Sequence, residues 1–138
     1  MQSANPWSSY RQVATQTASP GQLVLMLLDG AIKFLERALV GFDLEDPAES
    51  NQTIHNNISH AQEIIRELNQ SLDLGQGGDV ALNLRSLYVY FDRRLTEGNL
   101  RKVPEGIREV ARHLGEIRDG WSEMLKQQRS LAPAACVA

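Results

Sequence analysis

Apolar residues recur along the chain at the three- and four-residue spacing that is typical of amphipathic helices, and they do so in four separate blocks. No block shows the strict alternation of apolar and polar residues that a half-buried strand requires. The first block covers residues 19–42 and opens with Ser19-Pro20. This pair is a helix-start signal, because a serine hydroxyl can accept a hydrogen bond from a free backbone N–H, and proline at the first helical position leaves no N–H unpaired. The pattern predicts four helices and no sheet.

The other three blocks carry seams in alternating four- and three-residue steps, as in coiled coils. In the second block, residues 50–73, the seam consists of Ile54, Ile58, Ala61, Ile65, Leu68 and Leu72. The third block is expected to start at a cap on Asp79, after a break at the glycines of residues 75–78, and to end at Gly98-Asn99. Its seam consists of Val80, Leu84, Leu87, Phe91 and Leu95. In the fourth block, residues 103–128, the seam consists of Val103, Ile107, Val110, Leu114, Ile117, Trp121 and Met124.

The connections between the blocks are short enough to force neighbouring helices to run antiparallel. We therefore predict an all-α fold, an antiparallel up-down-up-down four-helix bundle. The bundle is assigned to residues 17–130, between an N-terminal arm of residues 1–16 and a disordered C-terminal tail of residues 131–138. The arm carries Trp7, Tyr10 and Val13 at three-residue spacing. It is too short to stay helical alone, but it could pack on the bundle as a short helix.

Size, charge and cysteine content narrow the class of protein. A chain of 138 residues fits one domain. Its net charge of −3 argues against nucleic-acid binding, which needs clustered basic residues. The longest apolar run, residues 23–28, is far shorter than the ~20 residues that span a bilayer, and no leader precedes the bundle, so we expect no membrane insertion and a cytoplasmic location. The single cysteine, Cys136, fits a reducing compartment.

The residue pattern offers no catalytic group, metal site or cofactor site. Metal ligands on a helix must lie one turn apart, whereas His55 and His60 are five residues apart, about 140° out of phase. We expect these two histidines and His113 on solvated helix surfaces. The glycines of residues 75–78 lack the Gly-Lys-Ser/Thr ending of a phosphate-binding loop. The chain is therefore expected not to be an enzyme.

The first block is more apolar than a bundle helix that faces water on one side needs to be. Its polar stripe is narrow, consisting of Gln22, Asp29, Lys33 and Glu36. Two interpretations remain open. Either this is the most buried helix, or part of the excess lines a groove, formed for example by Leu25, Leu28 and Ile32, that accepts an amphipathic helix from another protein. The two are compatible if the arm covers the groove through Trp7, Tyr10 and Val13 until a partner displaces it.

The third block carries two tyrosines on different faces. We expect either Tyr88 or Tyr90 to face the core and the other to be free for a ligand, because tyrosine supplies both apolar area and a hydrogen bond at interfaces. The adjacent Arg93 and Arg94 are expected on a solvated face or in an ion pair with Asp29 or Glu97.

Four collinear stretches resemble the FliS family, the flagellin-specific export chaperones of bacteria. The resemblance covers Tyr10 to about Leu125. The stretches are Thr17-Ala18-Ser19-Pro20 with Leu23, Met26-Leu27 and Asp29-Gly30; Ala61-Gln62, Ile64-Ile65 and Glu67-Leu68 running on to Leu72-Asp73; Leu87-Tyr88, Tyr90 and Arg93-Arg94-Leu95 with Asn99; and Arg118-Asp119 with Trp121. The family usually has Tyr where this chain has Leu28.

The resemblance implies a helical bundle that binds the disordered C-terminal segment of flagellin, prevents its premature polymerisation and keeps it ready for flagellar type III export. The export apparatus and flagellar regulators are possible further partners. The resemblance assigns partner contacts to Tyr10, Ser19, Pro20, Leu23, Leu25, Met26, Leu27, Tyr88 and Tyr90. The residue pattern alone adds Val13, Leu28 and Ile32. An alternative function is a helical adaptor or regulatory protein that binds another amphipathic helix.

Overall fold

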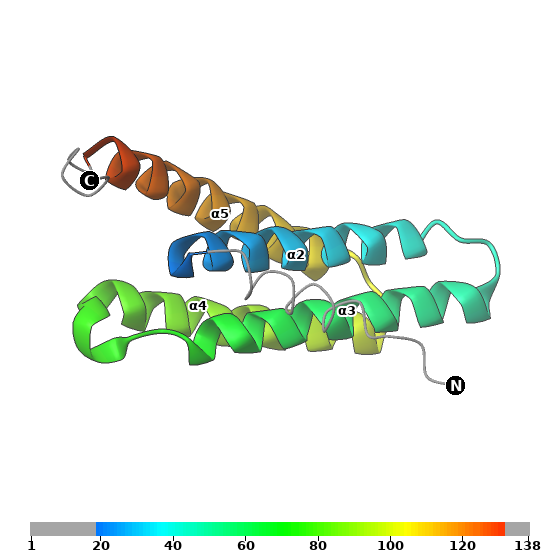
Figure 1. The fold of residues 1–138 in the computed structure, drawn as a ribbon. Coiled ribbons are helices and arrows are strands. Elements are labelled where there is room, and N and C mark those ends of the chain that lie inside the picture. The colour runs from blue at the N-terminus through cyan, green and yellow to red at the C-terminus, as the bar shows by residue number, and fades with distance from the viewer. Residues whose placement is uncertain (1–18, 132–138) are drawn as a thin grey trace, which may run out of the picture.

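The computed structural model describes residues 19–131, and these residues form four helices and no strand (Figure 1). Helix α2 covers Pro20–Gly41 and α3 covers Pro47–Gln70. Helix α4 covers Leu74–Arg101 and α5 covers Glu105–Leu131. The all-α prediction is confirmed for this part of the chain. The proposed arm, with Tyr10 and Val13, lies outside the described residues.

The four helices form the predicted antiparallel bundle. Helix α2 packs between α3 and α5, and α4 packs between the same two helices on the opposite side of the bundle. The starts of α2 and α4 therefore lie at the same end as the ends of α3 and α5. At this end α5 diverges from α4, as Figure 1 shows for its orange and red turns.

Helices α2 and α3 begin with the same chemistry. The Ser19 hydroxyl accepts a hydrogen bond from the Gln22 N–H at 3.2 Å, and Pro20 follows the cap. The carboxylate of Asp46 accepts from the Glu49 N–H at 3.0 Å, again with a proline next in the chain. The predicted start of the second helix, residue 50, was therefore three residues too late.

The glycine-rich stretch at the start of α4 interrupts helical geometry at one residue. The structure caps this helix at Asp73, whose carboxylate accepts from the N–H groups of Gly75 and Gln76 at 3.1 Å. A helical turn follows, and the backbone leaves helical geometry only at Gly78, with φ 58° and ψ −136°. The predicted break within residues 75–78 is confirmed at Gly78, but the helix is capped at Asp73 and not at Asp79. The predicted end at Gly98-Asn99 was wrong, because α4 runs on to Arg101 and closes with Lys102 in the left-handed conformation.

Replacing Gly78 by alanine should lower the free energy of unfolding by about 1–3 kcal/mol, since its backbone conformation is nearly restricted to glycine. Gly75→Ala is the matched control. Its backbone is helical, and an added Cβ would come no closer than 3.5 Å to another group, a carboxylate oxygen of Asp73. Denaturant unfolding of the two variants should separate them, and equal stabilities would contradict the strain assigned to Gly78.

One continuous core joins the four helices. Its largest fully buried side chains are Phe91, Leu28, Leu35, Ile54, Ile58, Ile64, Ile65, Leu68, Leu95, Ile107, Leu114 and Val110. Gln62 is buried among them, and its amide donates to the Asp92 carbonyl and the Thr96 hydroxyl of α4. The buried polar group is thus hydrogen-bonded, as burial requires.

Three predicted seam positions are exposed instead of buried. Val80 is 69% exposed, Leu87 39% and Val103 41%. On α4, Ala81 and Tyr88 are buried in place of Val80 and Leu87, each one residue further along, whereas the predicted seam residues Phe91 and Leu95 are buried as expected. One residue turns a helix by about 100°, so the first half of α4 presents a different side to the core than the sequence pattern indicated.

The histidines were expected on solvated surfaces, and two of them are packed instead. His60 lies with its ring centroid 5.0 Å from that of Phe34, and its Nδ1 is buried. His113 stacks on Phe91 at 5.9 Å. Only His55 is exposed, where it is hydrogen-bonded to Asn99 across the α3–α4 interface.

Candidate binding site

An apolar cavity of about 240 Å³ lies at the end of the bundle where α2 begins. All four helices contribute to it. Its lining consists of Val24, Leu28, Leu68, Ser71, Leu72, Asp73, Gly77, Ala81, Leu84, Tyr88, Ile117 and Trp121. Most of these side chains are apolar, so the cavity favours apolar groups over charged ones.

The end of α3 and the start of α4 form one side of the cavity. The Ser71 hydroxyl donates to the Leu68 carbonyl at 2.8 Å and closes the last turn of α3. Two residues later, Asp73 caps α4. These two hydrogen-bonded helix ends fix the turn between α3 and α4 at the cavity wall.

The distal half of α5 is attached to α2 on the other side. The indole Nε1–H of Trp121 donates to the Gly21 carbonyl at 2.8 Å. Arg118 forms an ion pair with Asp29 at 2.7 Å. An added Cβ on Gly21 would come within 2.6 Å of a terminal methyl of Leu125, so the two helices approach closely here. Trp121 thus both lines the cavity and holds α5 in place.

Two exposed apolar side chains of α4 lie beside the cavity. Leu87 precedes Tyr90 by three residues and Arg94 by seven, which places the three on one side of the helix. Tyr90 and Arg94 contact Glu109 of α5, so this side of α4 faces α5. Val80 lies two turns before Leu87 on the same side. Val80 and Leu87 each precede a residue that lines the cavity, Ala81 and Tyr88, and we call these two exposed side chains the apolar rim.

The two tyrosines of α4 have different environments. Tyr88 is 3% exposed, faces the core and lines the cavity, and burial raises its pKa to about 12. Tyr90 is half-buried, and its hydroxyl donates to a carboxylate oxygen of Glu109 at 2.7 Å. This hydrogen bond raises the pKa of Tyr90 and lowers that of Glu109. The tyrosine expected to be free for a ligand is thus bound to Glu109.

Arg94 is the central cation of the α4–α5 contact. Its guanidinium lies 2.9 Å from Glu109 and 2.8 Å from Glu97. The predicted ion pair with Glu97 is confirmed. The alternative partner, Asp29, is bound by Arg118 instead.

The predicted partner-binding residues of α2 fall into three groups. Ser19 and Pro20 are exposed at the helix start. Leu23, Leu25, Met26 and Ile32 are half-buried, whereas Leu27 and Leu28 are 4% and 0% exposed. Of these residues only Leu28 lines the cavity, together with Tyr88. Leu25 and Ile32 do not share that cavity with Leu28.

Other cavity residues were not singled out as partner contacts from the sequence. Leu72, Leu84, Ile117 and Trp121 were predicted as seam residues, and Val24 as part of the apolar excess of the first helix. A signal was nevertheless present, because antiparallel packing places the first turns of two helices beside the last turns of the other two.

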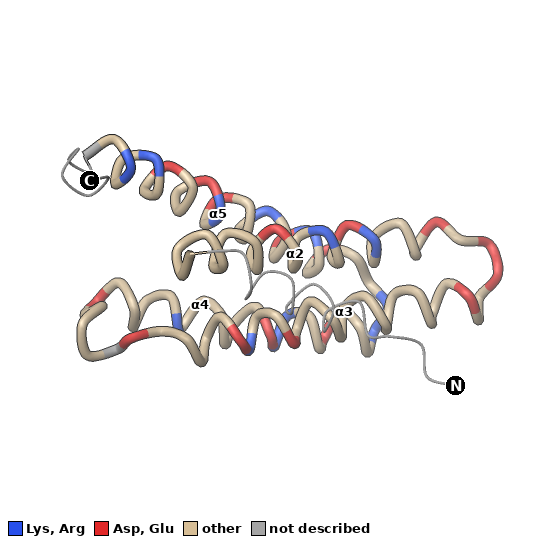
Figure 2. The backbone as a smooth tube through the Cα atoms, in the orientation of Figure 1, with Lys and Arg blue, Asp and Glu red and all other residues tan. Residues whose placement is uncertain are grey.

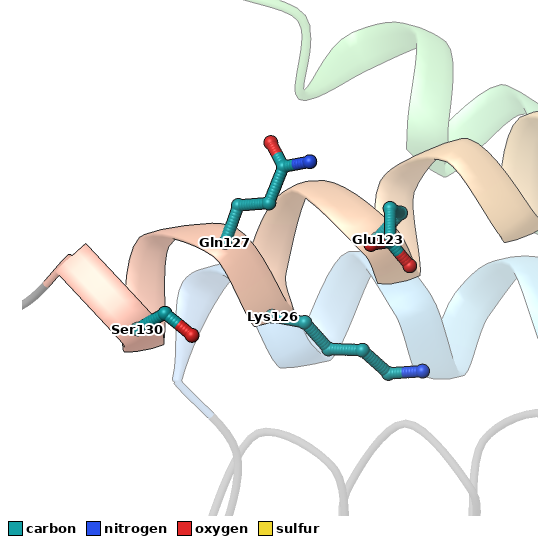
Figure 3. A pocket seen from close by; sticks show the side chains of 4 residues that line it. All are labelled: Glu123, Lys126, Gln127 and Ser130. Atoms are coloured by element: carbon teal, nitrogen blue, oxygen red, sulfur yellow. The ribbon is translucent and has the colours of Figure 1, made fainter.

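Two further depressions have a described lining that comes from one helix each. One, on the last turns of α5, is lined by Glu123, Lys126, Gln127 and Ser130, whose side chains spread in different directions from that helix (Figure 3). The other lies on α4 and is lined by Arg93, Thr96, Glu97, Leu100 and Arg101. Among the described residues no group of His, Cys, Asp and Glu side chains is arranged to hold a metal ion. Helices α2 to α5 also include none that is long and apolar enough to cross a membrane.

The fold and the cavity are those of a helical binding protein whose site suits apolar side chains. The chain belongs to the FliS family: residues 3–128 match the family described as "Flagellar protein FliS". It is 36% identical to the flagellar secretion chaperone FliS of Salmonella typhimurium over 129 residues, which cover 90% of this chain and 93% of that protein. It is 31% identical to the chaperone of the same name from Bacillus subtilis over 125 residues, which cover 91% and 90%. The family is one of chaperones and not of enzymes.

Proposed function

We propose that the chain is a cytoplasmic chaperone that binds the C-terminal segment of flagellin, prevents its premature polymerisation and assists its export through the flagellar type III apparatus. Its membership of the FliS family and the printed names of its relatives support a role in flagellar secretion. The observation that carries the proposal is the apolar cavity with its exposed rim at one end of the bundle.

In this proposal an amphipathic helix of the client lies along the rim formed by Val80 and Leu87 and inserts apolar side chains towards Leu28 and Tyr88. Each large aliphatic side chain that leaves water in this way contributes about 1.5–3 kcal/mol. Because the client orders as it binds, part of that gain is lost to conformational entropy, and the complex remains releasable. The chaperone thereby competes with flagellin subunits for the same apolar stripe.

The N-terminal arm is the second part of the proposal. The arm ends where α2 begins, and Val24, one turn into that helix, lines the cavity. In this proposal Tyr10 and Val13 of the arm cover the cavity in the free chain, and a client displaces them. Contacts from the first turns of α2, Ser19 to Met26, would then become available to the client as well.

Titration of a C-terminal flagellin fragment into the full chain tests the proposal by calorimetry. Val24→Phe should weaken binding about tenfold or more, because a larger side chain at the half-buried wall occupies the space that the client needs. Val40→Phe is the matched control, since Val40 lies at the other end of the same helix and is 61% exposed. Its affinity should equal that of the unmodified chain.

Two outcomes would contradict the proposal. If the unmodified chain does not bind the flagellin fragment at a 1:1 ratio, the client assignment is wrong. If binding is retained but both variants behave alike, the client binds elsewhere on the bundle and the cavity is not the site.

A further inference from the structure

Exposed apolar side chains are concentrated on one helix. Of the seven large hydrophobic residues that are exposed within residues 19–131, five lie on α4. Val80 and Leu87 belong to the rim of the cavity. The other three, Leu82, Val89 and Leu100, are 51%, 55% and 81% exposed and lie elsewhere on the helix. The cavity does not account for them.

These three residues belong to a second seam on α4. Its positions follow one another in alternating four- and three-residue steps: Leu82, Ser86, Val89, Arg93, Thr96 and Leu100. Residues at this spacing share one side of a helix, and the same spacing lines up the contacts of paired helices. The seam differs from the buried positions Ala81 and Tyr88, and all six of its residues are exposed. We call this side the outer stripe of α4.

Positive charge is concentrated on and beside the outer stripe, through Arg93 within it and Arg85 and Arg101 next to it on α4. Arg85 donates a hydrogen bond to the Asn69 side-chain oxygen, and Arg93 lies over the ring of Tyr90. Within residues 19–131, none of the three arginines Arg85, Arg93 and Arg101 forms an ion pair. The neighbouring carboxylates are already engaged by other cations. These pairs are Asp92 with Arg66 at 3.3 Å and Glu97 with Arg94 at 2.8 Å. Three cations are thus left for a partner of opposite charge.

The surface at the C-terminal half of the stripe is hollowed. The depression has a volume of about 420 Å³, and Arg93, Leu100 and Arg101 are among its lining residues. It therefore combines the most exposed leucine of the described chain with two unpaired arginines. Helix α5 packs against another side of α4, through Tyr90 and Glu109, and α3 meets only the edge of the stripe, where the Thr96 hydroxyl accepts a hydrogen bond from Gln62.

We propose that the outer stripe of α4 binds an acidic amphipathic helix of a second protein, distinct from the segment held at the cavity. The partner presents apolar side chains to Val89 and Leu100 and a carboxylate between them to Arg93. From Leu82 to Leu100 the stripe is about 27 Å long at a rise of ~1.5 Å per residue, so a helix of about 18 residues covers it. Arginine suits this role because its guanidinium binds carboxylates through two parallel hydrogen bonds.

The probe is a synthetic helical peptide of about 20 residues, with leucines in four- and three-residue steps and glutamates beside them. The control peptide replaces every glutamate by lysine. Fluorescence anisotropy with the full chain should show at least tenfold tighter binding of the acidic peptide. The double variant Arg93→Glu/Arg101→Glu should reverse this preference, because the charge of the stripe changes sign while its apolar residues stay the same.

Separate variants distinguish the stripe from the cavity. Val89→Asp and Leu100→Asp should each weaken binding of the acidic peptide tenfold or more. Both change exposed side chains, so the circular dichroism spectrum should stay unchanged. The affinity for the flagellin fragment should stay the same in both. Loss of flagellin binding in these variants would assign the stripe to the same client and overturn the proposal.

Other results would also overturn it. If neither peptide binds, or if both bind equally, the preference for an acidic partner is contradicted. A dimer that Leu100→Asp dissociates in sedimentation velocity would assign the stripe to a second copy of the chain. A gain in acidic-peptide affinity on Trp7→Ala would assign it to the chain's own arm.

Discussion

Leu95→Ala should lower the free energy of unfolding by about 2–5 kcal/mol, the largest effect that we expect from a single substitution in this chain. Leu95 is 0% exposed and belongs to the core that joins the four helices. Truncation to alanine removes apolar contacts and leaves a cavity that the packed interior fills only in part. Equilibrium unfolding in urea, followed by circular dichroism, measures the loss.

Leu100→Ala is the matched control for this substitution. It changes the same residue type on the same helix, but Leu100 is 81% exposed, so the expected change is within about 0.5 kcal/mol. Similar losses in the two variants would mean that α4 presents a different side to the core than described.

Trp121→Ala should have the second largest effect, about 2–3 kcal/mol, and the effect should be local. The indole supplies both a hydrogen bond to Gly21 and apolar contact at the cavity. The distal half of α5 has little else to hold it, because most side chains from Glu123 to Ser130 are exposed, and Gly115 and Gly120 lower its intrinsic helix stability.

Hydrogen exchange measures this local effect residue by residue. Amide protection in residues 115–131 should fall at least tenfold in Trp121→Ala, while the amides of Ile107 to Leu114 keep most of theirs. Trp121→Phe retains the ring packing and loses only the hydrogen bond, so a smaller change is expected. A uniform loss of protection along α5 would show that the helix opens as one unit with the bundle.

The apolar seams in the sequence were sufficient to predict the fold. The seam positions that were wrongly predicted as buried on α4 have a common cause. Val80 and Leu87 were assigned to the core because they continue the four- and three-residue spacing of Leu84, Phe91 and Leu95. The structure buries Ala81 and Tyr88 instead. A small residue can lie where helices approach closely, and a tyrosine can bury its ring, so side-chain size alone does not determine which face of a helix is buried.

The candidate site was harder to predict than the fold. Leu28 and Tyr88 were predicted partner contacts from different helices, and the structure brings both to one cavity. Leu25 and Ile32 were grouped with Leu28 by their spacing on one helix. They do not line the cavity, because its wall depends on how α3, α4 and α5 end and diverge. Those relations between helices are not contained in the periodicity of any one of them.

The distribution of charge separates the two surfaces of this chain by their response to ionic strength. No charged residue occurs in α2 before Asp29, so its first turns are uniformly tan in Figure 2. Among the described residues that line the cavity, Asp73 is the only charged one. Added salt hardly weakens apolar burial. It does screen the attraction between exposed charges, with a Debye length of about 10 Å at 0.1 M. If both proposed complexes form, the one at the cavity should withstand salt that dissociates the one at the outer stripe of α4, and the chain would retain one partner while it releases the other.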